Sequence, residues 1–125
     1  MTSKHTYLKT HRLSDDMLAF VLPSEVSSLG ERAASAKSGR AAKTLVKEGA
    51  IRITIIALNK GLTMQAHQVD GAVSIQVLRG RATINAAGSD ATMGAGGVAV
   101  LAPQQAHVAT ALTDCALLLT VAMPC

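Results

Sequence analysis

The chain has 125 residues, which suits one ordinary domain and is too short for two. Hydrophobic residues make up 49% and charged residues only 16%, and this composition excludes disorder as a whole-chain state. The net charge is +4 with basic residues dispersed along the chain and aromatic residues are 2%, so we expect no nucleic-acid partner and no site built on aromatic stacking.

Residues 1–42 predict a helical or irregular arm. Ser14 is a suitable cap for a first helix, which Pro23 is expected to stop. The run 28–31 (SLGE) matches a capping box and predicts a second helix, which Gly39 is expected to end. The Ala-rich composition of this second helix is typical of an amphipathic arm that lies on another part of the protein.

From residue 43 onward the pattern changes to the two-residue period of β-strands, as where Ile51 and Ile53 alternate with Arg52. Short apolar runs are separated by Gly, Asp and Asn, which are typical turn residues. The expected strands are 44–47, 51–55, 62–68, 72–79, 81–86, 98–102, 106–112 and 115–122. Many short strands predict a sandwich or small barrel, so the single domain would consist of an arm (1–42) and a barrel (43–125).

Targeting signals are absent from the sequence. The first five residues are polar and include no hydrophobic signal segment. The longest apolar stretch, residues 115–123, is far shorter than the ~20 residues needed to span a bilayer. We therefore expect a cytoplasmic protein with no membrane partner.

Two histidines fall on the expected strands. His67 has Gln65 and Val69 on its own face, and His107 has Gln105 on its face. Two imidazoles on different strands can meet inside a small barrel. A lone strand histidine is more often a hydrogen-bonded core residue than a ligand, so the spacing around the pair matters.

That spacing resembles the two motifs of the cupin superfamily. Residues 61–80 are similar to Gly-x5-His-x-His-x(3–4)-Glu-x6-Gly, with His67 at the first histidine. Residues 96–111 are similar to Gly-x5-Pro-x-Gly-x2-His-x3-Asn, with His107 at the histidine. The short gap between the motifs resembles small single-domain bacterial cupins of the RmlC-like type. The resemblance covers about residues 43–122.

The resemblance implies an all-β fold, a double-stranded β-helix or jelly-roll barrel, with a short N-terminal helical arm. Cupins usually hold a divalent metal through two histidines and a glutamate from the first motif and one histidine from the second. His67 and His107 match two ligand positions, whereas Val69 and Val73 stand where the other two would be. This degenerate set implies at most a weakly held zinc, nickel or iron ion at low occupancy.

Three functions follow from this set and stay open. The first is binding of a small molecule in a barrel pocket with an apolar floor. The second is an enzyme, dioxygenase-like with a metal or isomerase-like without one, that uses His67 and His107. The third is a structural or regulatory dimer with a vestigial pocket, since the high apolar content favours a homodimer. The expected pocket residues are His67, His107, Gln65, Gln105, Val69 and Val73.

Overall fold

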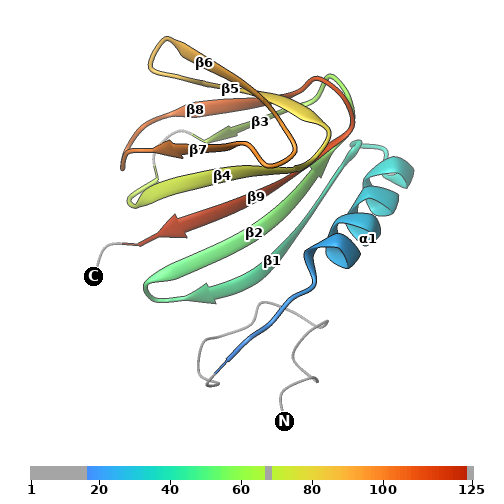
Figure 1. The fold of residues 1–125 in the computed structure, drawn as a ribbon, viewed down its shortest axis with the longest axis horizontal. Helices are drawn as coiled ribbons and strands as arrows, with labels where there is room; N and C mark the ends of the chain where they lie inside the picture. Colours follow the sequence, from blue (N-terminus) through green and yellow to red (C-terminus); the bar gives the residue numbers. More distant parts are fainter. Residues whose placement is uncertain (1–16, 67–68, 124–125) are drawn as a thin grey trace.

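The computed structural model describes residues 17–66 and 69–123, and these form one helix and nine strands (Figure 1). The helix covers one face of a sheet, and a second sheet covers the other face. The elements are α1 (Leu22–Ser35), β1 (Arg40–Glu48), β2 (Ile51–Leu58), β3 (Thr63–Ala66), β4 (Ala72–Arg79), β5 (Arg81–Ala86), β6 (Ser89–Gly94), β7 (Val98–Leu101), β8 (His107–Ala111) and β9 (Cys115–Ala122).

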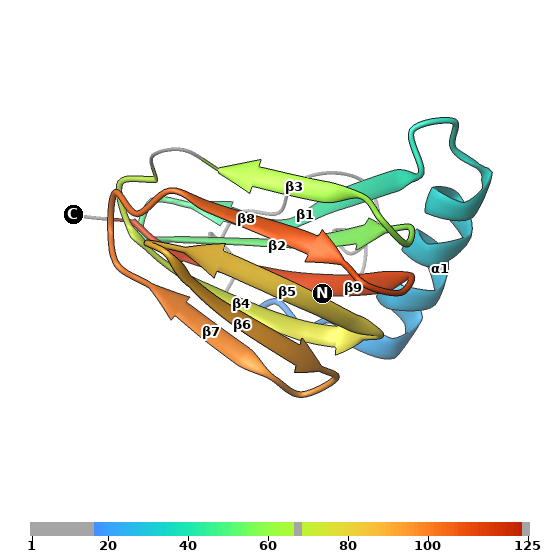
Figure 2. The same cartoon turned by 90° about the horizontal axis from the view of Figure 1, so that it is seen from above.

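The strands form two antiparallel sheets. The larger has the order β1-β2-β9-β4-β7, and the smaller has the order β3-β8-β5-β6. From β3 onward the chain crosses between the sheets at nearly every connection, which produces the stacked arrangement seen from above in Figure 2. The predicted all-β jelly-roll barrel is confirmed.

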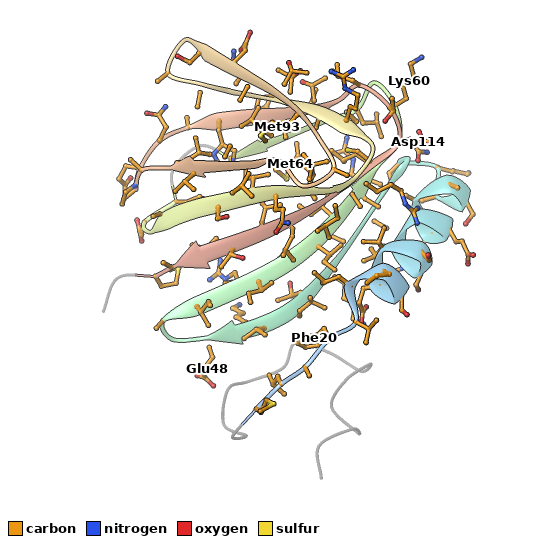
Figure 3. All side chains as sticks on the ribbon, in the orientation of Figure 1. Phe20, Glu48, Lys60, Met64, Met93 and Asp114 are labelled. Carbon is orange, nitrogen blue, oxygen red and sulfur yellow. The ribbon has the colours of Figure 1, made fainter. Side chains whose placement is uncertain are left out.

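Inward-facing aliphatic side chains fill the space between the two sheets. Along β4, burial alternates, and Val73, Ile75 and Val77 are at most 3% exposed. Met64 of β3 and Met93 of β6 pack against this core from the smaller sheet, as Figure 3 shows. The interior is thus aliphatic, as the near absence of aromatic residues predicts.

A second core lies between α1 and the outer face of the larger sheet. Leu29 and Ala33 of the helix pack with Ile55 and Ala57 of β2. Strand β2 is therefore buried on both faces, which explains why its sequence is almost continuously apolar. With 14 residues, α1 does not reach membrane-spanning length, and no other helix occurs in the described ranges.

Two features expected of the arm are wrong. Pro23 lies in the first turn of α1, where its missing N–H leaves no helical hydrogen bond unmade, so it begins the helix instead of ending one. Ser28 lies inside that same helix, and α1 ends at Ser35, before Gly39. Gly39 instead forms the following turn with φ +70°. The expected cap Ser14 lies outside the described residues.

The strands were predicted more accurately than the helix. Strands 72–79, 81–86 and 115–122 have the expected bounds, whereas β1 begins at Arg40 and is longer than expected. Strand β6 was missed because its sequence, SDATMG, is polar and rich in small residues. Pairing with β5 along its whole length forms it nonetheless.

Candidate functional site

His107 begins β8 and lies on the strand's inward-facing row. Burial alternates along β8, with His107, Ala109 and Ala111 buried and the residues between them partly exposed. Among the described residues, His107 is the one polar side chain classed with the buried core, at 3% exposure. The strand alternation thus places one imidazole in an otherwise aliphatic interior.

The two ring nitrogens of His107 have different surroundings. Nδ1 lies 3.3 Å from the backbone carbonyl oxygen of Gln105. Because that oxygen can only accept, Nδ1 is the donor in this contact, and the lone pair of an imidazole in this tautomer lies at Nε2. Nε2 is fully buried and has no hydrogen-bond partner among the described residues. The ring is anchored at one nitrogen and unsatisfied at the other.

Small side chains flank the ring within its own sheet. Ala66 of β3 and Ala86 of β5 are the register partners of His107 on the two neighbouring strands. No bulky side chain therefore stands beside the imidazole in either neighbouring position.

Across the barrel, the larger sheet contributes an apolar row at the same end. Val73 pairs with Val121 on one side and with Leu101 on the other, and all three pack in the barrel core. Strands β2, β4 and β8 all begin at this end, whereas Lys60 and Asp114 mark the opposite end in Figure 3. We call it the His107 end of the barrel.

Arg52 of β2 is part of this end and was missed as a site residue. Its register partner on β9 is Val121, and its sequence neighbours Ile51 and Ile53 pack toward α1 instead. Arg52 therefore faces the barrel. The signal was present in the sequence, because continuing the alternation to Ile56 places Arg52 in the barrel-facing row.

The two expected glutamines do not line the barrel interior. Gln65 is exposed and pairs with Val108 on the outer face of the smaller sheet, because the inward row of β3 is Met64 and Ala66. The side chain of Gln105 donates to the carbonyl of Ala106 at 3.0 Å, so only its backbone oxygen serves His107. A shallow outer depression of about 280 Å³ is lined by Gln65, Ala66, Asn85, Ala106, His107 and Val108.

The two valines expected to form an apolar pocket floor both pack in or against the barrel core. Val73 is 3% exposed in the barrel core, and Val69 is half-buried against it. The carbonyl of Val69 accepts a hydrogen bond from the Gln104 N–H at 2.8 Å, which ties the β3–β4 connection to the β7–β8 connection. The side chains at the His107 end are thus aliphatic, and this hydrogen bond connects two loops that each run between the sheets.

A separate cavity of about 300 Å³ lies between α1 and the larger sheet, and several of the polar groups that line it are paired with one another or with the backbone. Arg79 reaches the Ser27 hydroxyl at 3.4 Å, and Asp114 accepts from the Lys60 N–H at 2.7 Å. Cys115 also lies there, and burial, with a smaller effect of Asp114, raises the pKa of its thiol to about 11. A thiol with so high a pKa is a poor nucleophile near neutral pH.

Comparison with known proteins identifies the fold. No protein-family model and no curated protein matches the chain. A conserved protein of unknown function from Streptococcus pyogenes is 21% identical with a TM-score of 0.70, over 94% of this chain and 96% of that one. An RmlC-like cupin from Shewanella frigidimarina is 20% identical with a TM-score of 0.65, over 72% and 81%. The chain has a cupin fold.

The same fold also occurs in an enzyme. A salicylate 1,2-dioxygenase from Pseudaminobacter salicylatoxidans is 14% identical to this chain with a TM-score of 0.67, over 79% of this chain and 33% of that one. At such identities the similarity establishes the fold and leaves the function to the residues of this chain.

The described residues of this chain do not supply the four-ligand metal centre that the motif resemblance implies. By the motif spacing, Val69 and Val73 are expected at two of the ligand positions, and neither side chain offers a donor. Within residues 17–66 and 69–123, no group of three or more His, Cys, Asp or Glu side chains is placed to hold a metal ion. His67 lies outside the described residues, so its pairing with His107 stays a prediction.

Proposed function

We propose that this cupin binds a small molecule at the His107 end of its barrel. The observation that carries the proposal is the buried Nε2 of His107, which has no partner among the described residues. A buried unpaired acceptor costs roughly 1–3 kcal/mol, and a ligand hydroxyl or amide N–H donating to it would recover much of that cost. The core residues at this end, Val73 and Val121, are aliphatic and at most 8% exposed, so the proposed contact with the rest of the ligand is apolar.

Binding accounts for the surroundings of His107 better than acid–base catalysis does. A catalytic histidine is commonly oriented by a carboxylate, whereas Nδ1 of His107 contacts a neutral backbone carbonyl. This contact holds the ring in place and leaves Nε2 as an acceptor. The proposed role of the imidazole is therefore to orient a bound molecule.

A weakly held zinc, nickel or iron ion on His67 and His107 belongs to the proposal as a minor species. Two imidazoles without a carboxylate bind such ions poorly. Elemental analysis of protein purified without nickel affinity chromatography should find far less than one metal ion per chain. One tightly held ion per chain would instead support the metal-dependent enzyme.

A second candidate function is the structural or regulatory dimer. Val98 and Val100 of the edge strand β7 are 51% and 72% exposed, so they form an apolar surface outside the barrel. In this alternative the dimer is the functional unit and the pocket is a relic. The homodimer and the cytoplasmic location stay predictions from the sequence.

Three small probes that share one aliphatic body and differ in the head group test the binding proposal. Isovalerate, isovaleramide and isoamyl alcohol are titrated at millimolar concentrations against protein labelled at valine and leucine methyl groups. At least one should shift the NMR signals of Val73 and Val121. The substitution His107→Ala should weaken that binding about tenfold, as expected for one lost hydrogen bond.

The matched control is Ser89→Ala, because Ser89 is exposed at the same end, on β6, and does not line the depression that His107 lines. It should leave the affinity unchanged. The proposal is wrong if none of the three probes shifts the Val73 and Val121 signals. It is also wrong if His107→Ala, with a wild-type-like methyl spectrum, binds as tightly as the unmodified protein.

A further inference from the structure

A second unsatisfied nitrogen lies at the His107 end. Within the described residues, two buried side-chain nitrogen or oxygen atoms have no hydrogen-bond partner, and they are Nε2 of His107 and Nε of Arg52. Both residues lie on barrel-facing rows, His107 on the smaller sheet and Arg52 on the larger. Packed sheets lie roughly 10 Å apart, so two long side chains that enter from opposite sheets approach each other.

The charge of Arg52 has no counter-charge within the described part of the chain. A guanidinium stays protonated at all relevant pH values, and no described carboxylate forms an ion pair with it. Two of the described acidic side chains are paired elsewhere, Glu25 with Lys43 and Asp70 with Gln104. The buried Nε of Arg52 lacks an acceptor, and a bound anion would supply one together with the opposite charge.

Exposure of β2 to solvent does not explain why residue 52 is an arginine. The barrel-facing row of β2 runs from Arg52 through half-buried Thr54 to Ile56 and Leu58, which pack in the core. Val121, beside Arg52 on β9, is 8% exposed. The row ends in an arginine with a buried Nε, at the same end as the buried imidazole.

We infer that the ligand of this pocket is a small aliphatic carboxylate whose carboxyl group is bound by Arg52. The inference rests on the proposed function, since it names the class of molecule bound near His107. A guanidinium matches a carboxylate with two parallel hydrogen bonds. His107 Nε2 would accept from a hydroxyl or N–H elsewhere on the ligand, and the valines would contact its hydrocarbon part.

A carboxylate fits this site better than a phosphate does. One guanidinium balances one negative charge, whereas a phosphate dianion would leave one charge uncompensated. Val121 beside Arg52, and Val73 and Leu101 beyond it, provide no side-chain hydrogen-bond donors for additional oxygens. A monoanion with an aliphatic body therefore suits this side of the site.

Isovalerate and isovaleramide, which differ only in charge and in one head-group atom, test the inference. Near neutral pH, isovalerate should bind the full-length protein about tenfold more tightly than isovaleramide, because charge-assisted hydrogen bonds are stronger than neutral ones. Arg52→Met keeps the side-chain length and removes the charge. This variant should bind isovalerate more weakly and isovaleramide as before, so the preference for isovalerate should be lost.

Arg52→Lys and Arg81→Met complete the set. Arg52→Lys keeps the positive charge but loses the planar guanidinium. It should retain part of the preference for isovalerate over isovaleramide, which would show that the preference depends on charge in a folded variant. Arg81 is exposed on β5 at the far end of the barrel, so Arg81→Met should change neither affinity. Methyl spectra of each variant verify its fold.

The outcomes separate the inference from the proposed function. If isovaleramide binds as tightly as isovalerate and binding still depends on His107, the pocket stands and the carboxylate inference is overturned. An unchanged preference in folded Arg52→Met overturns the role of Arg52. Tighter binding of inorganic phosphate than of isovalerate at this end overturns the ligand class. If none of the probes binds, both the pocket and the inference fail.

Discussion

His107 and Cys115 are both buried, but their environments give them different roles. The thiol of Cys115 lies among apolar and backbone groups and stays protonated, which suits a packing residue. The imidazole of His107 is held at Nδ1 and unsatisfied at Nε2. A residue kept for packing alone would not need an unsatisfied nitrogen.

This difference predicts the effect of His107→Leu on stability. Leucine removes the unpaired acceptor and loses one long hydrogen bond, so the free energy of unfolding should rise or stay within about 1 kcal/mol of the original value. Urea unfolding measures it. A loss of 2 kcal/mol or more would show that His107 is a satisfied structural residue, and it would contradict the binding role.

Cys115 predicts an alkaline loss of stability. Its pKa in the folded protein is raised from 9.0 to about 11, so the unfolded chain loses this proton first as the pH rises. The stabilisation is fully present below pH 9 and is lost between 9 and 11, and it amounts to roughly 2–3 kcal/mol.

Unfolding free energies at pH 8 and pH 11 check this for the unmodified protein and for Cys115→Ala. The variant should lose about 2–3 kcal/mol less between these two pH values. Cys125 is present in both proteins and so cancels in the comparison. Equal losses would show that the Cys115 thiol does not stay protonated in the folded state.

Residue-level prediction succeeded for some side chains and failed for others. The positions of Val73 and His107 followed from motif spacing, because spacing along strands determines the sheet and the end at which a residue lies. Gln65 is exposed on the smaller sheet and lines one depression with His107, so its role as a pocket residue stays a prediction. Arg52 was overlooked because its row could be identified only from the partners of β2 on β9.

At the level of elements, α1 is held by tertiary packing. No side chain caps its N-terminus, and its sequence contains four serines and one glycine. Leu29 is 1% exposed between the helix and the larger sheet, where it packs in the second core. The half-buried ion pair of Lys43 and Glu25, at 2.8 Å, adds a polar link between β1 and α1.

Leu29→Ala should therefore lower the free energy of unfolding by roughly 2–4 kcal/mol, because it leaves a cavity between helix and sheet. Ser28→Ala, on the exposed side of the same helix, should change it by less than about 0.5 kcal/mol. Chemical denaturation measures both variants. Equal effects would show that the helix does not depend on packing against the sheet.

The contrast between helix and strands explains which elements the sequence predicts. Strand signals are local alternations bounded by turn residues, so most strands could be located. The helix boundary depended on Pro23, which is compatible with both the end of one helix and the start of another. Strand β6 depends on its pairing with β5, which no local pattern reveals.

For the molecule as a whole, the helix covers only part of the larger sheet. α1 packs mainly on β1, β2 and β9 and reaches β4 through the contact of Ser27 with Arg79, so the helix lies toward the β1–β2–β9 side of the larger sheet. Exposed Val98 and Val100 lie on β7 at the edge of that sheet. This apolar surface is where we expect a second copy to pack if the homodimer predicted from composition forms.

Light scattering after size-exclusion chromatography tests the dimer. The unmodified protein should have the mass of two chains at micromolar concentration, and the double variant Val98→Lys, Val100→Lys should have the mass of one. Leu112→Lys is the control, because Leu112 is also exposed, at 40%, and follows β8 instead of belonging to β7. A monomeric unmodified protein would contradict the prediction.

The overall fold was predictable because the spacing between two short motifs encodes the order of strands around a barrel. The ligand was not, because the same barrel serves proteins with different activities and the side chains at one end decide which molecule fits. Here those side chains are one imidazole, one guanidinium and a row of aliphatic groups.

The location of a bound probe tests the central claim most directly. Intermolecular nuclear Overhauser effects from isovalerate should reach the methyl groups of Val73 and Val121 and the ring of His107. Contacts to Ala34 or Ala57, which line the cavity beside α1, would place the ligand outside the barrel and contradict the account.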